Sequence, residues 1–159
     1  MSVQKVKEYL SVFGLDTRVR ELELSSATVE LAAKALGTEG KRIAKSISLH
    51  SKDGCCLLVV CAGDCKIDNA KFKARFGFKP RMLSPDEALE MTGHAVGGVC
   101  PFALPEDVTV YLDGSLRRFD TVFPAAGSSN SALELTCDEL FTASRAASWE
   151  DVCKIREEI

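Results

Sequence analysis

Two apolar segments on either side of a turn signal constrain the fold more than any other feature of this 159-residue sequence. Apolar and polar side chains alternate from Ile43 to Leu49, and Cys55 to Ala62 is an apolar, β-branched run. Asp53-Gly54 lies between them, and this dipeptide favours a tight hairpin turn. A short continuous apolar run is typical of a strand buried on both faces. The sequence therefore predicts a β-hairpin whose second strand lies in the centre of a sheet.

Periodicity and capping signals predict helices and short strands around this hairpin. We expect helices at residues 2–13, 28–36, 68–76, 85–92 and 138–142, with Ser25-Ser26 introducing the second of them. Strands are expected at residues 19–24, 108–112, 119–123 and 132–136, and a polar tail is expected after the last helix. Helices and strands intermingle with hairpin-length connections. The predicted fold is therefore α+β, with a mixed sheet curled toward a barrel rather than a doubly wound sheet.

Length and composition are those of an ordinary globular protein. With 159 residues, of which 46% are hydrophobic, the chain can bury one sizeable core, so a single domain spanning residues 1–159 is expected. The longest strongly apolar run, Cys55 to Gly63, is far shorter than the roughly 20 residues of a membrane span. Seven cysteines are an odd number and form no Cys-x-x-Cys pair, which favours reduced thiols and a cytoplasmic location.

Charge is unevenly distributed along the chain. Residues 41–81 carry ten Lys and Arg against three Asp and Glu, a net charge of +7, whereas the rest of the chain carries −10. A basic patch that neutralises phosphates binds a nucleic-acid backbone without reading its sequence. The pattern indicates an RNA backbone as a partner, with a solvated helix face at residues 71–75 as the alternative. The candidate RNA-binding residues are Lys41, Arg42, Lys71, Lys73 and Arg75.

The segment from Gly93 to Phe102 is too rich in glycine for a helix interior and is predicted to be a shaped loop. Within it, Gly97-Gly98-Val99-Cys100-Pro101 can turn consecutive N–H groups toward one anion or oxyanion, because glycine accepts positive φ. Pro101 has no N–H but fixes the turn, so the amides before it would be the donors. A tight structural turn is the alternative interpretation.

Lys45 lies in the alternating stretch that leads into the hairpin, so its ammonium points either to solvent or into a cleft. In a cleft, a compact cation could hold a phosphate or a carbonyl oxygen of a substrate, and burial could lower its pKa toward base chemistry. The sequence leaves both orientations open.

Other residues of the loop regions allow further chemistry. Cys100 and His94 lie six residues apart and permit a cysteine-nucleophile hypothesis, but a buried inert thiol is favoured because no third group is evident to orient the histidine. His50 is the only other histidine, so neither a metal site nor a cofactor is expected. Ser128-Ser129-Asn130 after Gly127 supply hydroxyls and an amide that suit a polar substrate or an ordinary turn.

Several segments together resemble one known family over residues 26–144, which is most of the chain. They are Leu31 to Gly37, Arg42 to Ser46, Thr92 to Phe102, and Ala126-Gly127 with Leu133-Glu134-Leu135. On these residues the sequence resembles the YbaK/ProX family, the aminoacyl-tRNA deacylases related to the editing domain inserted in bacterial prolyl-tRNA synthetase. The resemblance implies a free-standing editing enzyme. It also implies a mixed, largely antiparallel sheet curled into a barrel-like body with flanking helices.

The resemblance implies roles for individual residues. In that family a lysine at the position of Lys45 helps to place the tRNA terminus, and amides of the loop from Gly97 to Pro101 hold the aminoacyl carbonyl. The candidate substrate-binding residues are Thr28, His94, Ala126, Gly127, Ser128, Ser129 and Asn130.

The sequence departs from two branches of the family near one of these loops. The branch resembling Cys-tRNA(Pro) deacylases has Ser-Gly-Gly where this chain has Ala125-Ala126-Gly127. The branch resembling Ala-tRNA(Pro) deacylases has a His-Pro-x-x-Asn segment, and here Phe123-Pro124-Ala125-Ala126 keeps the proline and lacks the histidine. The sequence therefore does not decide which small amino acid, such as Ala, Cys, Ser or Thr, is the acyl group of the substrate.

The resulting hypothesis is a hydrolase that acts in trans on the ester between a small amino acid and a mischarged tRNA, with tRNA(Pro) favoured. The acceptor end of transfer RNA is the expected partner, and the sequence leaves open whether prolyl-tRNA synthetase is a second one. Neither DNA nor a membrane is expected as a partner. The alternative is a non-catalytic tRNA-binding or synthetase-associated module. A third hypothesis is a cysteine hydrolase of a small amide or ester.

Overall fold

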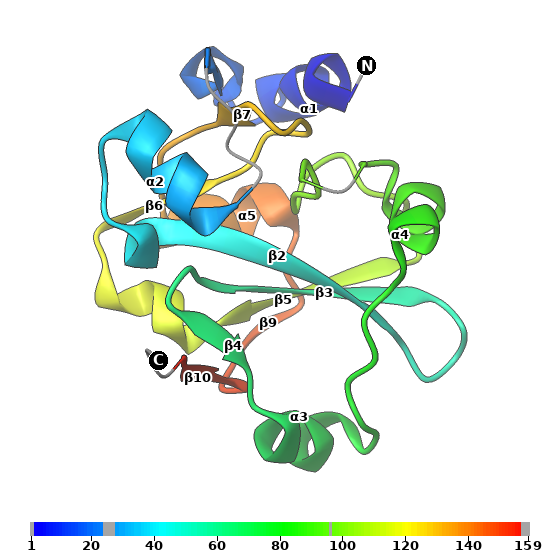
Figure 1. Cartoon of the computed structure of the whole chain (residues 1–159). Coiled ribbons are helices and arrows are strands. Elements are labelled where there is room, and N and C mark those ends of the chain that lie inside the picture. Colours follow the sequence, from blue (N-terminus) through cyan, green and yellow to red (C-terminus); the bar gives the residue numbers. More distant parts are fainter. Residues whose placement is uncertain (1, 24–27, 96, 157–159) are drawn as a thin grey trace.

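The computed structural model describes residues 2–23, 28–95 and 97–156 (Figure 1). The helices within these residues are α1 (Ser2–Ser11), α2 (Val29–Leu36), α3 (Asn69–Phe76), α4 (Pro85–Thr92) and α5 (Cys137–Ser144). The strands are β1 (Arg20–Glu21), β2 (Ile43–His50), β3 (Cys56–Ala62), β4 (Cys65–Ile67), β5 (Val108–Asp113), β6 (Thr121–Pro124), β7 (Ser131–Ala132), β8 (Leu135–Thr136), β9 (Ser148–Glu150) and β10 (Cys153–Ile155). This order confirms the predicted α+β class. None of the described helices is long and apolar enough to cross a membrane.

Six strands form one curled sheet in the order β8-β6-β2-β3-β5-β9 (Figure 1). β2 and β3 are antiparallel, from Ala44 opposite Ala62 to His50 opposite Cys56, which confirms the predicted hairpin. β3 also pairs in parallel with β5, so both of its edges are covered and every residue of the strand is buried. β2 with β6 and β5 with β9 are further parallel pairs, and β6 with β8 is antiparallel, so the sheet is mixed.

Two small antiparallel sheets lie beside the curled sheet. One pairs β1 with β7, and the other pairs β4 with β10 (Figure 1). The second of these brings the C-terminal end of the described chain next to the turn that follows β3. That turn packs closely against the segment that precedes β2, because a Cβ added at Gly63 would lie 2.0 Å from the carbonyl oxygen of Gly40.

The helices begin where side chains cap their first turns. Ser84 and Glu87 form the capping box of α4, and Asp68 accepts the Lys71 N–H at the start of α3. Thr28 caps α2 by accepting the Leu31 N–H. Between the helices and the sheet, fully buried side chains form the core, and the largest of them include Phe72, Phe102, Leu58, Leu112 and Leu140.

The polar tail predicted after residue 142 is wrong. The chain instead forms β9, which pairs with β5, and β10, which pairs with β4. Each strand has three residues and carries charged side chains among the apolar ones, so no alternation was visible. Tertiary contacts hold the segment: the Trp149 ring stacks on Phe141 with centroids 6.1 Å apart, and Asp113, 39 positions earlier in the chain, accepts the Val152 N–H at 2.9 Å.

Other predicted strands are shorter than expected. The segment 132–136 divides into β7 and β8, and the strand expected at 19–24 is confined to Arg20–Glu21. Leu24, at the end of that expected strand, and Ser25-Ser26, expected to introduce α2, lie outside the described residues.

Candidate active site

A cavity of about 870 Å³ opens against β2. β2 contributes seven consecutive lining residues, from Ile43 to Leu49, and the start of α2 contributes Thr28, Val29 and Ala32. Gly97 and Val99 of the predicted loop also line it. Lys45 and the glycine loop, separated by more than fifty residues in the sequence, therefore face the same cavity.

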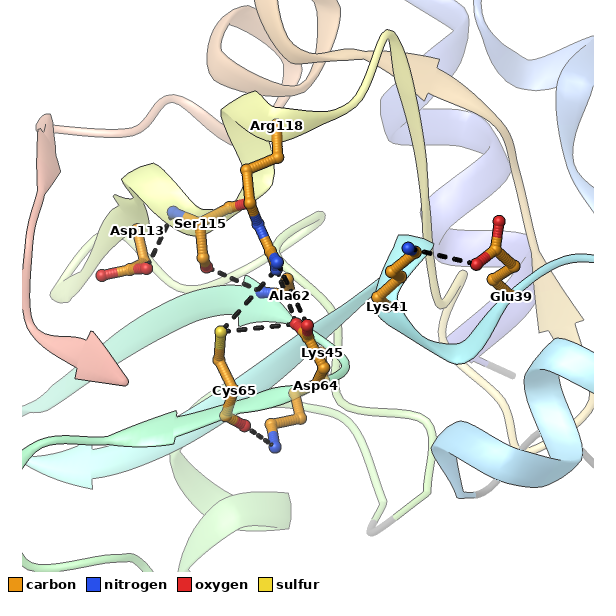
Figure 2. A network of polar contacts seen from close by, with 9 residues as sticks. All are labelled: Glu39, Lys41, Lys45, Ala62, Asp64, Cys65, Asp113, Ser115 and Arg118. Carbon is orange, nitrogen blue, oxygen red and sulfur yellow. Dashed lines mark hydrogen bonds and ion pairs between the residues drawn. The ribbon is translucent and has the colours of Figure 1, made fainter. Parts of the chain in front are cut away.

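Lys45 is fixed at the cavity wall by its hydrogen bond to a backbone carbonyl. It lies on β2 opposite Cys61 of β3, and its Nζ donates to the carbonyl oxygen of Cys65 at the start of β4 (Figure 2). A carbonyl oxygen orients an ammonium but does not carry the full negative charge of a carboxylate. The positive charge of Lys45 is therefore available to an anionic ligand in the cavity.

The turn that carries the Cys65 carbonyl is itself held in place. Arg118 donates to both carboxylate oxygens of Asp64 at 2.6 and 3.1 Å (Figure 2). These hydrogen bonds lower the pKa of Asp64. The Ala62 N–H donates to the Ser115 hydroxyl at 3.1 Å, and both Ser115 and Arg118 belong to the short helix Gly114–Arg118. This helix thereby braces the turn that orients Lys45.

The loop at Gly97 has the close packing that its glycines permit. Gly97 has φ +89°, a left-handed conformation that favours glycine. A Cβ on Gly98 would lie 2.7 Å from the Cα of Ser128, so the two loops approach closely only because residue 98 is glycine. The Gly98 N–H donates to Ala95 within the loop at 2.9 Å. Within the described parts of the chain, the N–H groups of Gly97 and Val99 have no hydrogen-bond partner.

Cys100 and His94 lie behind this loop and do not line the cavity. Both are fully buried, and the Cys100 Sγ is 3.5 Å from His94 Nε2. Burial raises the pKa of the Cys100 thiol to about 12, and burial also lowers the pKa of His94. His94 Nε2 lies 2.8 Å from the Phe102 carbonyl oxygen, a contact that closes the loop. The pair is in contact, but this thiol has neither the ionisation nor the access that a nucleophile requires.

Comparison with known proteins places this geometry in a family. A model of the aminoacyl-tRNA editing domain matches residues 24–143. The chain belongs to the aminoacyl-tRNA editing domain family. It is 54% identical over 154 residues to the uncharacterized protein YwhH of Bacillus subtilis (strain 168), covering 97% of this chain and 98% of YwhH. It is also 32% identical over 109 residues to a proline–tRNA ligase of Thermosipho melanesiensis, covering 67% of this chain and 19% of the ligase.

Solved structures confirm that this editing domain has the expected family fold. A candidate trans-editing enzyme for prolyl tRNA synthetase superposes with a TM-score of 0.86 and 30% identity, covering 96% of this chain and 97% of that one. A hypothetical protein superposes with a TM-score of 0.84 and 31% identity, covering 94% of this chain and 99% of that one. The likeness extends over nearly the whole length of both structures.

The loop from Ala126 to Asn130 of the editing domain is held by its own polar groups. The Ser128 hydroxyl donates to Asn130 Oδ1 at 2.9 Å, and Asn130 Nδ2 donates to the Leu22 carbonyl at 3.0 Å. Ala126 and Gly127 are buried, and Ser129 is exposed. The cavity is lined instead by Ala125, Ser131 and Ala132, which flank the loop. An isolated β-bridge between Ala125 and Ala132 places the two flanks side by side.

The basic residues predicted to bind RNA do not line the cavity, and carboxylates engage several of them. Lys41 pairs with Glu39 at 3.2 Å, Lys71 with Asp151 at 2.9 Å, and Arg42 with Glu134 at 3.3 Å. Arg75 binds both carboxylate oxygens of Glu150, at 2.7 and 3.0 Å. Lys73 is exposed on α3.

Two cations that the sequence analysis did not single out line the cavity: Lys66 of β4 and Arg156, which follows β10. No sequence signal could have found Arg156, because its position depends on β10 pairing with β4. Among the described residues, no three His, Cys, Asp or Glu side chains gather as a metal site requires.

Proposed function

We propose that this protein hydrolyses the ester that links a small amino acid to the terminal ribose of a mischarged tRNA, and that it acts in trans. The observation that supports this most directly is that Lys45, Gly97 and Val99 line one cavity. The cavity volume of about 870 Å³ falls within the roughly 300–1,000 Å³ of small-molecule sites. It is large enough for an adenosine that carries a small acyl group.

The chemistry needs few protein groups because an aminoacyl ester is already activated. Backbone N–H groups directed at the carbonyl oxygen stabilise the charge that develops when water attacks the carbonyl carbon. On this proposal the N–H groups of Gly97 and Val99 are those donors. A positioned water molecule attacks, the neighbouring ribose hydroxyl relays the proton, and Lys45 holds the terminal phosphate. No cysteine is required.

Similarity to a proline–tRNA ligase and to a candidate trans-editing enzyme for prolyl tRNA synthetase supports tRNA(Pro) as the substrate. Ala125, Ala132 and Phe123 form an apolar part of the cavity wall, and the Ser131 hydroxyl beside Ala132 is engaged by Ser128 at 2.8 Å, which favours a small apolar acyl group such as alanine. Such a pocket acts as a second sieve, because it admits a small wrong amino acid and excludes a larger correct one.

The alternative is a tRNA-binding or synthetase-associated module without catalysis, which would use the same cation and loop. The two functions can be distinguished by one measurement, since a binding module leaves the aminoacyl ester intact.

The seven cysteines are all free thiols in the structure. This supports a reducing compartment such as the cytoplasm as the place of action.

The deciding experiment is a deacylation assay of the purified protein against tRNA(Pro) charged with Ala, Ser, Thr, Cys or Pro. We expect release of at least one small non-cognate amino acid at a rate well above spontaneous hydrolysis, with Pro-tRNA(Pro) left intact. Binding of every tRNA without loss of any ester would instead support the binding module.

A further inference from the structure

The two-stranded sheet of β4 and β10 presents a row of three cations: Lys66, Lys154 and Arg156. Lys66 lies directly opposite Lys154 in the antiparallel register, and Arg156 follows Lys154 by two residues. In a strand pair, residues directly opposite and residues two apart share one face. The three exposed side chains therefore lie on the same face, which we call the cationic ribbon face.

This arrangement has an electrostatic cost in the free protein. Like charges directly opposite each other destabilise a strand pair. Neither Lys66 nor Lys154 forms a salt bridge with any described residue. A bound anion would remove the repulsion between the two lysines.

The cationic ribbon face is continuous with the cavity. Lys66 and Arg156 line it together with Lys45. Cys65, which accepts the Lys45 hydrogen bond, directly precedes Lys66. The Arg156 N–H donates to the Asp64 carbonyl at 2.8 Å, so the ladder extends one residue beyond β10. Three cations, from β2, β4 and the C-terminal segment, thus line one cavity.

One carboxylate competes for this face. Glu30 of α2 lies 3.7 Å from the Arg156 guanidinium and also lines the cavity. Both side chains are largely exposed, and such pairs are weak and readily exchanged for another anion. The ion pair joins α2 to the C-terminal segment across the cavity until a ligand replaces it.

We propose that the cationic ribbon face binds phosphodiesters of the single-stranded 3′ end of tRNA while the terminal nucleotide occupies the cavity. The proposal rests on the proposed function and adds the path along which the substrate strand approaches. It assigns the phosphate contacts to Lys66, Lys154 and Arg156, with Glu30 as their competitor.

The test measures equilibrium binding of uncharged tRNA over a range of salt concentrations, with Lys66→Ala, Lys154→Ala and Arg156→Ala. The slope of log K against log salt is about −0.7 for each phosphate of a single strand. Each variant should therefore weaken binding and make the slope shallower by about 0.7. Lys52→Ala, at an exposed position in the β2–β3 turn, is the matched control and should match the wild type.

A second arm uses tRNA from which the single-stranded 3′ end has been removed. The wild type should bind this truncated tRNA with a shallower salt slope than intact tRNA. The three alanine variants should bind the truncated tRNA with the same affinity as the wild type. Equal losses on intact and truncated tRNA would overturn the proposal, as would ribbon variants that bind intact tRNA like the wild type. Thermal unfolding of each variant checks that the fold is retained.

Glu30→Gln gives a change in the opposite direction. Releasing Arg156 should tighten tRNA binding about two- to fivefold, and Arg156→Ala should abolish that gain. Failure of the proposed function can be distinguished from failure of the binding face. If the wild type deacylates no aminoacyl-tRNA but the variants still change the salt slopes as expected, the proposed function fails and the binding face is supported. Deacylation with unaltered slopes in all three alanine variants would reject the binding face alone.

Discussion

The ammonium of Lys45 is hydrogen-bonded to the main-chain carbonyl of Cys65, a residue twenty positions further along the chain. The contact joins the middle of the curled sheet to the first residue of β4. Because the partner is a neutral oxygen, a phosphate that enters the cavity can bind the Lys45 ammonium without breaking an ion pair. The first prediction depends on this arrangement.

Lys45→Ala should reduce deacylation by about 100-fold, the loss typical of removing one strong electrostatic contact from an active site. It should also weaken tRNA binding. Initial rates with each small aminoacyl-tRNA(Pro) measure the effect, and Lys52→Ala, which removes the same charge from an exposed turn, should match the wild type. Wild-type turnover of every substrate by Lys45→Ala would reject the role given to this lysine.

Gly98→Ala should separate the two loops that meet beside the cavity. The added Cβ would lie 2.7 Å from Ser128 Cα and 2.9 Å from the carbonyl carbon of Gly127, both backbone atoms that cannot easily move. We expect unfolding in urea to show a loss of about 1–3 kcal/mol, together with reduced deacylation. Gly114→Ala is the control, because its Cβ would meet only the Glu150 carbonyl oxygen at an ordinary 3.7 Å. Equal stabilities of the two variants would contradict the close approach.

Cys100→Ala should leave turnover unchanged. The thiol is fully buried with its pKa raised to about 12, so no useful fraction of thiolate exists near neutral pH. We expect a loss of stability of about 1 kcal/mol from the missing sulfur, and activity that resists iodoacetamide. A folded but inactive Cys100→Ala protein would restore the cysteine-nucleophile hypothesis.

The buried His94 should make stability depend on pH. Burial lowers its pKa in the folded state below the ordinary 6.5, so the unfolded chain binds the proton more readily. Stability is therefore complete above about pH 6.5 and falls as the pH decreases from there toward the folded-state pKa, by up to about 1.4 kcal/mol per pH unit. The measurement is the free energy of unfolding between pH 8 and pH 5.

His94→Gln provides the comparison, because its amide can still donate to the Phe102 carbonyl but does not titrate. Its stability should decline less steeply below pH 6.5 than that of the wild type. Parallel curves for the two proteins would show that His94 does not carry the dependence.

Local sequence signals predicted the elements whose stabilisation is local. The Asp53-Gly54 turn and the apolar run to Ala62 specified the β2–β3 hairpin, and Ser84 with Glu87 specified the start of α4. β9 and β10 were missed because three-residue strands have no recognisable period. They exist through pairing with β5 and β4, which lie far away in the sequence.

The same distinction applies to the candidate site. The sequence left open whether Lys45 faces solvent or a cleft, and in the structure it lines one cavity with Gly97 and Val99. Ser128 and Asn130 were selected because they are polar, but their polar groups bind within their own loop and to Leu22. Lys71 and Arg75 were selected by charge, and the carboxylates that engage them belong to the C-terminal segment, whose path could not be read from sequence.

β2 is paired on both sides at Ala44, with Ala62 of β3 on one side and Pro124 of β6 on the other. The neighbouring Lys45 is thus anchored in a part of the backbone that cannot shift without breaking two ladders. The part of the cavity that we propose holds the acyl group is bordered, by contrast, by residues at the ends of loops, such as Ala125 and Ser131. A designer who wished to retarget this scaffold to another amino acid would therefore vary those loop ends and leave the cation untouched.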